Sequence, residues 1–166
     1  MRLGARILTH FVPGQAGQIW GVQPKMTDIV DVKTRSRMMA GIRGKDTKPE
    51  MAVRRFLHGM GYRYRLHRRD LPSTPDLVLP KYGTVIFVHG CFWHGHDCRY
   101  FRLPKTRTDF WDEKISGNRS RDRKNRKLLE EAGWQVITIH ECEIRDKQDW
   151  QQRLLDALGA GSDSGD

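Results

Sequence analysis

Three cysteines and several histidines gather in two short parts of the chain. Cys91, His94, His96 and Cys98 lie within eight residues, and Cys142 follows a later apolar run. Thiolates and imidazoles are the ligands of structural zinc, and four of them close a tetrahedral site. The pattern therefore predicts zinc held by three cysteines and one histidine, and the spacing leaves open whether His94 or His96 is the fourth ligand. The alternative interpretation is three inert thiols.

A carboxylate, Asp76, stands at the beginning of one predicted strand, and the next strand ends at His89. Nucleases place Mg²⁺ where a carboxylate faces the end of the hairpin partner of its own strand. A Pro-Asp pair at a strand start is also ordinary turn chemistry. His89 and His94 follow the second strand five residues apart, so both could reach a group bound at Asp76. Imidazoles titrate near neutral pH, which suits proton transfer to or from a water or a leaving oxygen.

Large aromatic side chains interrupt the same polar loop. Phe92 and Trp93 are adjacent in a segment flanked by Gly90 and Gly95. Two neighbouring residues of such a loop rarely both point inward, so at least one of the pair is expected to be exposed. Core packing is the alternative interpretation. Trp111 follows near the start of a predicted helix.

Hydrophobic periodicity predicts the elements that position these residues. Thr47 and Glu50 fit a capping box at the start of a helix, which explains Glu50 without any catalytic role. The other predicted elements are a short basic helix at 34–42, strands at 62–66, 76–79 and 84–89, a helix at 109–132 broken near 117–118, a strand at 135–140 and a final helix from 150. This order predicts an α/β fold with a mixed central sheet flanked by helices.

The charge balance points to a polyanionic partner. The 166 residues carry a formal net charge of +10. Twelve bases and two acids lie between residues 33 and 69, and seven bases and one acid lie between 114 and 127. Charge runs are often solvated helix faces, but here acids are nearly absent, which favours contact with phosphates.

The ends of the chain, its cysteine count and its hydropathy limit where in or outside the cell the protein is expected. We expect a disordered or non-native extension at residues 1–25, one domain at residues 26–158, and a flexible tail at residues 159–166. Three cysteines cannot complete a disulfide framework, and a transmembrane helix is excluded because no run of about 18 apolar residues occurs. We therefore expect a soluble, intracellular protein with no membrane partner.

Several long segments carry a resemblance to one enzyme family. The runs TRSRMMAGIRGKDTKPE, PSTPDLVLP, VIFVHGCFWHGHDC and KTRTDFWDEKISGNRSRDRKNRKLLEEAGWQVITIHECE closely resemble the very-short-patch repair (Vsr) endonucleases. The resemblance covers residues 26–158 and implies a strand-specific enzyme that nicks double-stranded DNA 5′ to the thymine of a T·G mismatch left by 5-methylcytosine deamination. It also implies a PD-(D/E)xK nuclease (restriction-endonuclease-like) fold with an added zinc site, a monomer, and transient contact with mismatch-repair proteins. The implied location is the bacterial cytoplasm, with association to the nucleoid while the enzyme acts.

The resemblance also implies a role for each candidate residue. Asp76 and the main-chain carbonyl of Val88 would hold catalytic Mg²⁺. His94 would transfer the proton, His89 would assist at the phosphate, and Glu50 would orient His94. Structural zinc would be bound by Cys91, His96, Cys98 and Cys142, and Phe92, Trp93 and Trp111 would intercalate beside the mismatch. The sequence departs from the wider superfamily in reading Phe87-Val88-His89 where an acidic residue and a lysine are usual.

Two other functions fit part of this pattern. A type II restriction-like endonuclease would share the fold and the Mg²⁺ site but would cut both strands. A non-catalytic, zinc-stapled DNA-binding module would keep the cysteines and the basic runs, and would need neither Asp76 nor His94.

Overall fold

The computed structural model describes residues 31, 33, 34, 37 and 44–160. The predicted extension at 1–25, most of the predicted basic helix at 34–42 and most of the predicted tail lie outside the described residues. None of the helices within the described part of the chain is both long enough and apolar enough to cross a bilayer.

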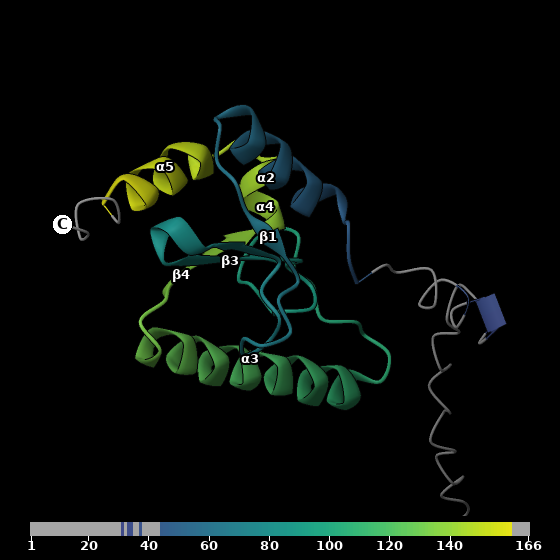
Figure 1. The fold of residues 1–166 in the computed structure, drawn as a ribbon. Coiled ribbons are helices and arrows are strands. Elements are labelled where there is room, and N and C mark those ends of the chain that lie inside the picture. The colour runs from purple at the N-terminus through teal and green to yellow at the C-terminus, as the bar shows by residue number, and fades with distance from the viewer. Residues whose placement is uncertain (1–30, 32, 35–36, 38–43, 161–166) are drawn as a thin grey trace, which may run out of the picture.

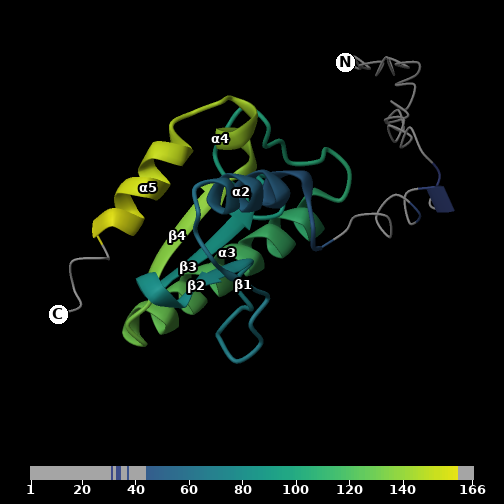
Figure 2. The same cartoon turned by 45° about the horizontal axis from the view of Figure 1, so that its top comes forward.

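A four-stranded sheet forms the centre of the described chain. Its strands lie side by side in the order β1 (Arg65–Leu66), β2 (Leu77–Leu79), β3 (Thr84–His89) and β4 (Gln135–His140). The first three strands are antiparallel, and β3 and β4 are parallel, with His89 opposite His140 (Figure 2). The short helix η1 (Pro80–Tyr82) joins β2 to β3 and ends at Gly83, whose φ of +55° suits a residue without a Cβ. The predicted hairpin and mixed sheet are confirmed.

Helices cover both faces of the sheet. Figure 1 shows α2 (Lys48–Gly59), α4 (Glu141–Arg145) and α5 (Trp150–Ala160) on one side and α3 (Thr108–Glu131) on the other. Because side chains alternate along a strand, β2, β3 and β4 each supply both cores. Leu77 and Ile86 pack with α2 and α5, whereas Val78 and Val85 pack with Leu129 of α3. The parallel pair β3–β4 is connected through α3, as a parallel connection requires.

The predicted capping box of α2 is confirmed. The side chain of Thr47 accepts a hydrogen bond from the backbone N–H of Glu50, and the carboxylate of Glu50 accepts one from the N–H of Thr47. Pro49 occupies the first turn, where its missing N–H is not needed. These local bonds fix where α2 begins, and they place Glu50 against the sheet.

Three details differ from the prediction. The expected break near residues 117–118 is wrong, because α3 is continuous and Gly117 stands exposed on its surface. A single helical glycine costs only about 1 kcal/mol relative to alanine, which the packing of a 24-residue helix outweighs. The strand expected over 62–66 is limited to β1, and the short helix α4 was not predicted.

Candidate active site and metal centre

The cysteine–histidine loop leaves β3 and is held in place by α3. Asn118 Nδ2 donates a hydrogen bond to the backbone oxygen of Trp93 at 2.8 Å, and Arg119 Nε donates to that of His94 at 3.3 Å. Gly95 has φ +57°, and a Cβ at this position would lie 2.5 Å from Arg119 Nε. The close approach of α3 therefore requires glycine here, and α3 sets the position of the two residues before it.

His94 is bound by a carboxylate and stacked on a second imidazole. Its Nδ1 lies 2.6 Å from Asp122 Oδ2, and its ring stacks on that of His89 with centroids 3.5 Å apart and planes 8° from parallel. An ionised carboxylate can only accept a hydrogen bond, so Nδ1 of His94 carries the proton. Nε2 of a neutral His94 is then a proton acceptor.

His89 differs from His94 in its electrostatic surroundings. Burial, together with the nearby His94, His140 and Arg126, lowers the pKa of His89 to about 3. His89 is therefore neutral at physiological pH, which suits a hydrogen-bonding role better than that of a general acid. The stacked pair thus combines one carboxylate-bound imidazole with one neutral imidazole.

Asp76 is half-buried at the start of β2 and is fixed to β3. Its Oδ2 accepts a hydrogen bond of 2.8 Å from the backbone N–H of Val88. Burial raises the pKa of Asp76 and the negative charge of Glu50 raises it further, whereas the bond from Val88 opposes this shift. A pocket of about 420 Å³ is lined by Val88, Trp93 and His94. The backbone segment that binds Asp76 thus meets both a candidate proton acceptor and an aromatic side chain.

Glu50 belongs to a different network from the one expected. Its buried carboxylate pairs with Arg54 and lies 3.6 Å from Nε2 of His67. The carboxylate on His94 is Asp122, so the structure does not form the expected contact between Glu50 and His94. The physical reason is the capping box, which ties Glu50 to the first turn of α2 and directs its remaining oxygen towards Arg54.

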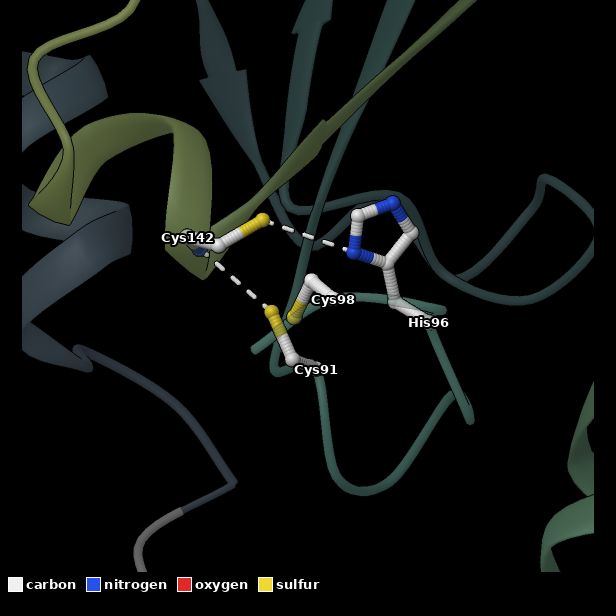
Figure 3. A group of neighbouring side chains, drawn as sticks. All are labelled: Cys91, His96, Cys98 and Cys142. Atoms are coloured by element: carbon white, nitrogen blue, oxygen red, sulfur yellow. Dashed lines mark hydrogen bonds between the residues drawn. The ribbon is translucent and has the colours of Figure 1, made fainter. Parts of the chain in front are cut away.

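The four predicted zinc ligands converge, as Figure 3 shows. One ligand atom from each of Cys91, His96, Cys98 and Cys142 lies within 4.8 Å of the others. Nδ1 of His96 lies 3.4 Å from Sγ of Cys142, whose N–H donates to Sγ of Cys91 at 3.4 Å. In a tetrahedral zinc site with Zn–S bonds of about 2.3 Å, the sulfur atoms lie about 3.8 Å apart. The donor set therefore fits zinc, and the geometry selects His96 rather than His94.

Burial raises the pKa of two of the thiols, Cys91 and Cys142. It raises the pKa of Cys91 to about 12, so this sulfur stays protonated without a cation nearby. A bound divalent cation favours the thiolate and removes the proton.

The three aromatic residues named by the resemblance form one cluster. Ring centroids are 5.1 Å apart for Phe92 and Trp93, 5.3 Å for Phe92 and Trp111, and 6.2 Å for Trp93 and Trp111. All three side chains are partly exposed, and Phe110, which is 45% exposed, packs on Trp111. The cluster therefore joins the cysteine–histidine loop to the start of α3.

Sequence reasoning missed the carboxylate partner of His94. Asp122 is the one acid among seven bases between residues 114 and 127, which was the available signal. It also missed His140, whose ring stacks on that of His96 with centroids 3.8 Å apart. The register of β4 against β3 places His140 beside His89, and this pairing depends on the fold.

The known proteins that are similar to this chain are DNA endonucleases or nicking enzymes. The family model described as DNA mismatch endonuclease Vsr matches residues 27–100. The type II nicking enzyme V.XorIIP of Xanthomonas oryzae pv. oryzae is 49% identical over 133 residues, which cover 80% of this chain and 98% of that protein. The DNA mismatch endonuclease Vsr of Escherichia coli is 44% identical over 123 residues, covering 74% and 79% of the two chains. Among solved structures, the catalytic domain of the homing endonuclease I-Bth0305I matches 70% of this chain with a TM-score of 0.47 and 20% identity.

The sheet presents the carboxylate of Asp76 and the carboxylate-bound His94 beside a basic helix. Together with these relatives, this arrangement defines the protein as a DNA endonuclease. Within that class, the chain belongs to the Vsr DNA mismatch endonuclease family.

Proposed function

We propose that this protein nicks one strand of double-stranded DNA 5′ to the thymine of a T·G mismatch arising from 5-methylcytosine deamination, and so begins very-short-patch repair. The observation that carries the proposal is the shared pocket of Val88, Trp93 and His94. A group for proton transfer, the backbone held by Asp76 and an aromatic side chain all face one space. Such an arrangement can couple the disturbance of a base step to cleavage beside it.

Asp76 is the residue proposed to hold Mg²⁺, together with the main-chain carbonyl of Val88. Mg²⁺ commonly binds through one or two carboxylates and keeps several waters, so a site with a single Asp fits this ion. When bound, the ion neutralises charge on the phosphate and lowers the pKa of a bound water.

His94 is the proposed group for proton transfer. With Nδ1 donating to Asp122, its Nε2 takes a proton from the attacking water, and Asp122 stabilises the imidazolium that results. His89, stacked against His94 and neutral, donates a hydrogen bond to a phosphate oxygen. We assign the fold to the PD-(D/E)xK class, in which His89 stands at the position of the usual lysine.

The aromatic cluster is the proposed wedge. Opening a base step costs a few kcal/mol, and the cost is least at a mismatched step. Side chains anchored between the cysteine cluster and α3 can enter the stack without collapse of their loop. This supplies a physical basis for preferring T·G over matched DNA.

A nicking assay on matched and T·G-mismatched duplexes, with each strand labelled and read on a denaturing gel, tests the proposal. Cleavage confined to the thymine strand, 5′ to the mismatched thymine, is expected with Mg²⁺. The Asp76→Asn variant should lose nicking by orders of magnitude while mismatch binding is retained. Cleavage of both strands of matched DNA would instead indicate a restriction-like enzyme, and binding without cleavage would indicate a non-catalytic module.

Zinc is proposed as a structural ion, because a Cys₃His set leaves no open coordination position for substrate. Replacing Cys98 with serine should lower the zinc content and the free energy of unfolding together, since formation of the site is coupled to folding. Metal analysis and chemical denaturation of the same preparations measure both quantities. A variant that remains as stable as the wild type with no zinc bound would rule out this role.

A further inference from the structure

A second pocket adjoins the candidate active site on the α3 side of the sheet. It has a volume of about 270 Å³ and lies between α3 and the ends of β3 and β4. Alternation along the strands directs His89 of β3, and Thr138 and His140 of β4, into this space. His94 lines this pocket as well as the one that contains Trp93. A ligand here would therefore lie directly beside the proton-transfer group.

The lining of this pocket is strongly cationic. Arg119, Arg123 and Arg126 enter it from α3, and Asp122 is the one acid among its lining residues. The carboxylate of Asp122 is already bonded to His94. Three guanidinium groups thus face the pocket without a matching number of negative charges.

The contacts of the three arginines hold two of them in position and leave one unpaired. Arg119 donates through Nε to the backbone of His94. Arg126 donates through Nη2 to Thr138 Oγ1 at 3.1 Å, and its Nη1 pairs with the exposed carboxylate of Glu130 at 3.2 Å. Arg123 has no hydrogen bond or ion pair with any residue that the structure describes. Arg119 and Arg123 are thus not neutralised by a carboxylate of the described residues, and such guanidinium groups suit the planar, bidentate recognition of phosphate oxygens.

We propose that this space, termed the α3 anion pocket and defined by Arg119, Arg123, Arg126, His89 and His140, binds a backbone phosphate of DNA next to the cleaved phosphodiester. The inference rests on the proposed function, because it takes DNA as the ligand. Successive phosphates of one strand are separated by roughly 3.4 Å of helix rise. A strand that places one phosphate at His94 therefore brings its neighbour within reach of a pocket that shares His94. The phosphate is either an internal diester or the terminal 5′-phosphate left by the nick.

The test measures DNA affinity against salt concentration without Mg²⁺, so that no cleavage occurs. The double variant Arg123→Gln/Arg126→Gln removes two pocket cations from an exposed helix face, and Lys124→Gln is the matched control on the same helix outside the pocket lining. For the double variant, the slope of log affinity against log salt should be shallower by about 0.9, which corresponds to one lost phosphate contact. The control should keep the wild-type slope. An unchanged slope in the double variant, or an equal change in the control, would overturn the proposal.

Duplexes of three kinds distinguish the two sources of the phosphate. They are an intact duplex, a nicked duplex with a 5′-phosphate and the same nicked duplex without it. If the pocket takes the terminal phosphate, the wild type should prefer the phosphorylated nick and the double variant should lose that preference. If it takes an internal diester, the double variant should lose affinity equally for all three.

The result can be separated from the fate of the proposed function. If the protein gives the expected salt slopes but does not nick T·G duplexes, the pocket proposal holds and the mismatch-specific activity is excluded. If the protein nicks T·G duplexes but the double variant keeps the wild-type slope, the activity holds and the pocket proposal is overturned. Circular dichroism of each variant verifies that the helix is intact.

Discussion

Two of the histidine–carboxylate pairs beside the sheet, His67–Glu50 and His94–Asp122, differ in what else binds the carboxylate. Beside α2, the carboxylate of Glu50 is 2% exposed and is paired with the guanidinium of Arg54, which leaves His67 as a more distant partner at 3.6 Å. Beside α3, the carboxylate of Asp122 has His94 as its one ion-pair partner among the described residues, at 2.6 Å.

This difference distinguishes a structural network from the network that we propose to be reactive. At Glu50 the negative charge is balanced by a permanent cation, so the pair gains little from protonation of His67. At Asp122 the balancing charge must come from the imidazole itself, which is the condition for stabilising His94 after it accepts a proton. A carboxylate beside a histidine therefore has different surroundings at the two places because of one arginine.

The largest effect on the nicking rate should come from replacing His94, with replacement of His67 as the comparison. His94→Ala should lower the rate of nicking by about 10²–10⁴-fold, the usual contribution of a general acid or base. His67→Ala, the matched variant on the other pair, should change the rate by much less. Single-turnover nicking of a T·G duplex measures both rates, and similar losses in the two variants would erase the distinction between the pairs.

A smaller effect is expected from Asp122→Asn. The amide keeps the shape but removes the charge that stabilises protonated His94, and it can donate to Nδ1 and so favour the wrong tautomer. The nicking rate should fall by about 10- to 100-fold, the range for residues that orient an active group. The pH–rate profile should also shift to lower pH, because protonated His94 loses its stabilising charge and the neutral form that accepts a proton persists to lower pH. A reduced rate with an unchanged profile would indicate that Asp122 only supports the packing of α3.

The raised pKa of Asp76 predicts that the affinity for Mg²⁺ depends on pH. Burial is the main cause of this shift, so Asp76 begins to be protonated at a higher pH than an ordinary carboxyl as the pH falls. The affinity for Mg²⁺ should fall with it, whereas the stability of the metal-free fold should rise slightly, because the folded state has the higher affinity for the proton.

Nicking at limiting Mg²⁺ between about pH 5 and pH 8 measures this effect. A tenfold increase in Mg²⁺ should move the acid limb of the profile by up to about one pH unit towards lower pH. An acid limb that does not respond to Mg²⁺ would assign the titration to His94 instead.

The smallest effect on rate should come from Glu50→Gln, whose main consequence is on stability. Arg54 would lose its buried partner and keep only Asp46, which lies 2.6 Å from its Nη1. Breaking a buried ion pair typically costs about 3–5 kcal/mol, and the remaining Asp46 favours the lower end. Chemical denaturation measures this loss, with Asp70→Asn as a control at the exposed pair with Arg68. A large loss of nicking with normal stability would restore Glu50 to the catalytic group.

Local patterns in the sequence were sufficient for much of the fold. The capping box of α2, the hairpin around Gly83 and the strand over 135–140 depend on neighbours within a few residues, and each is confirmed. Phe92 and Trp93 were also recognisable as candidate functional residues, because such side chains are unusual in a polar loop. The continuity of α3 was not predictable in this way, since its packing outweighs the weak helix propensity of Gly117.

The sequence by itself determined which residues could bind zinc, hold a cation or transfer a proton, because those capacities belong to the side chains. Only the tertiary structure decided how they are paired. His94 and Asp122 are 28 residues apart, and Cys91 and Cys142 are 51 apart, so no local spacing reports these contacts. The docking of α3 against the loop gives His94 its carboxylate, and the capping box withholds Glu50 from it. Long-range packing thus selected the reactive pair from residues that the sequence had made equally suitable.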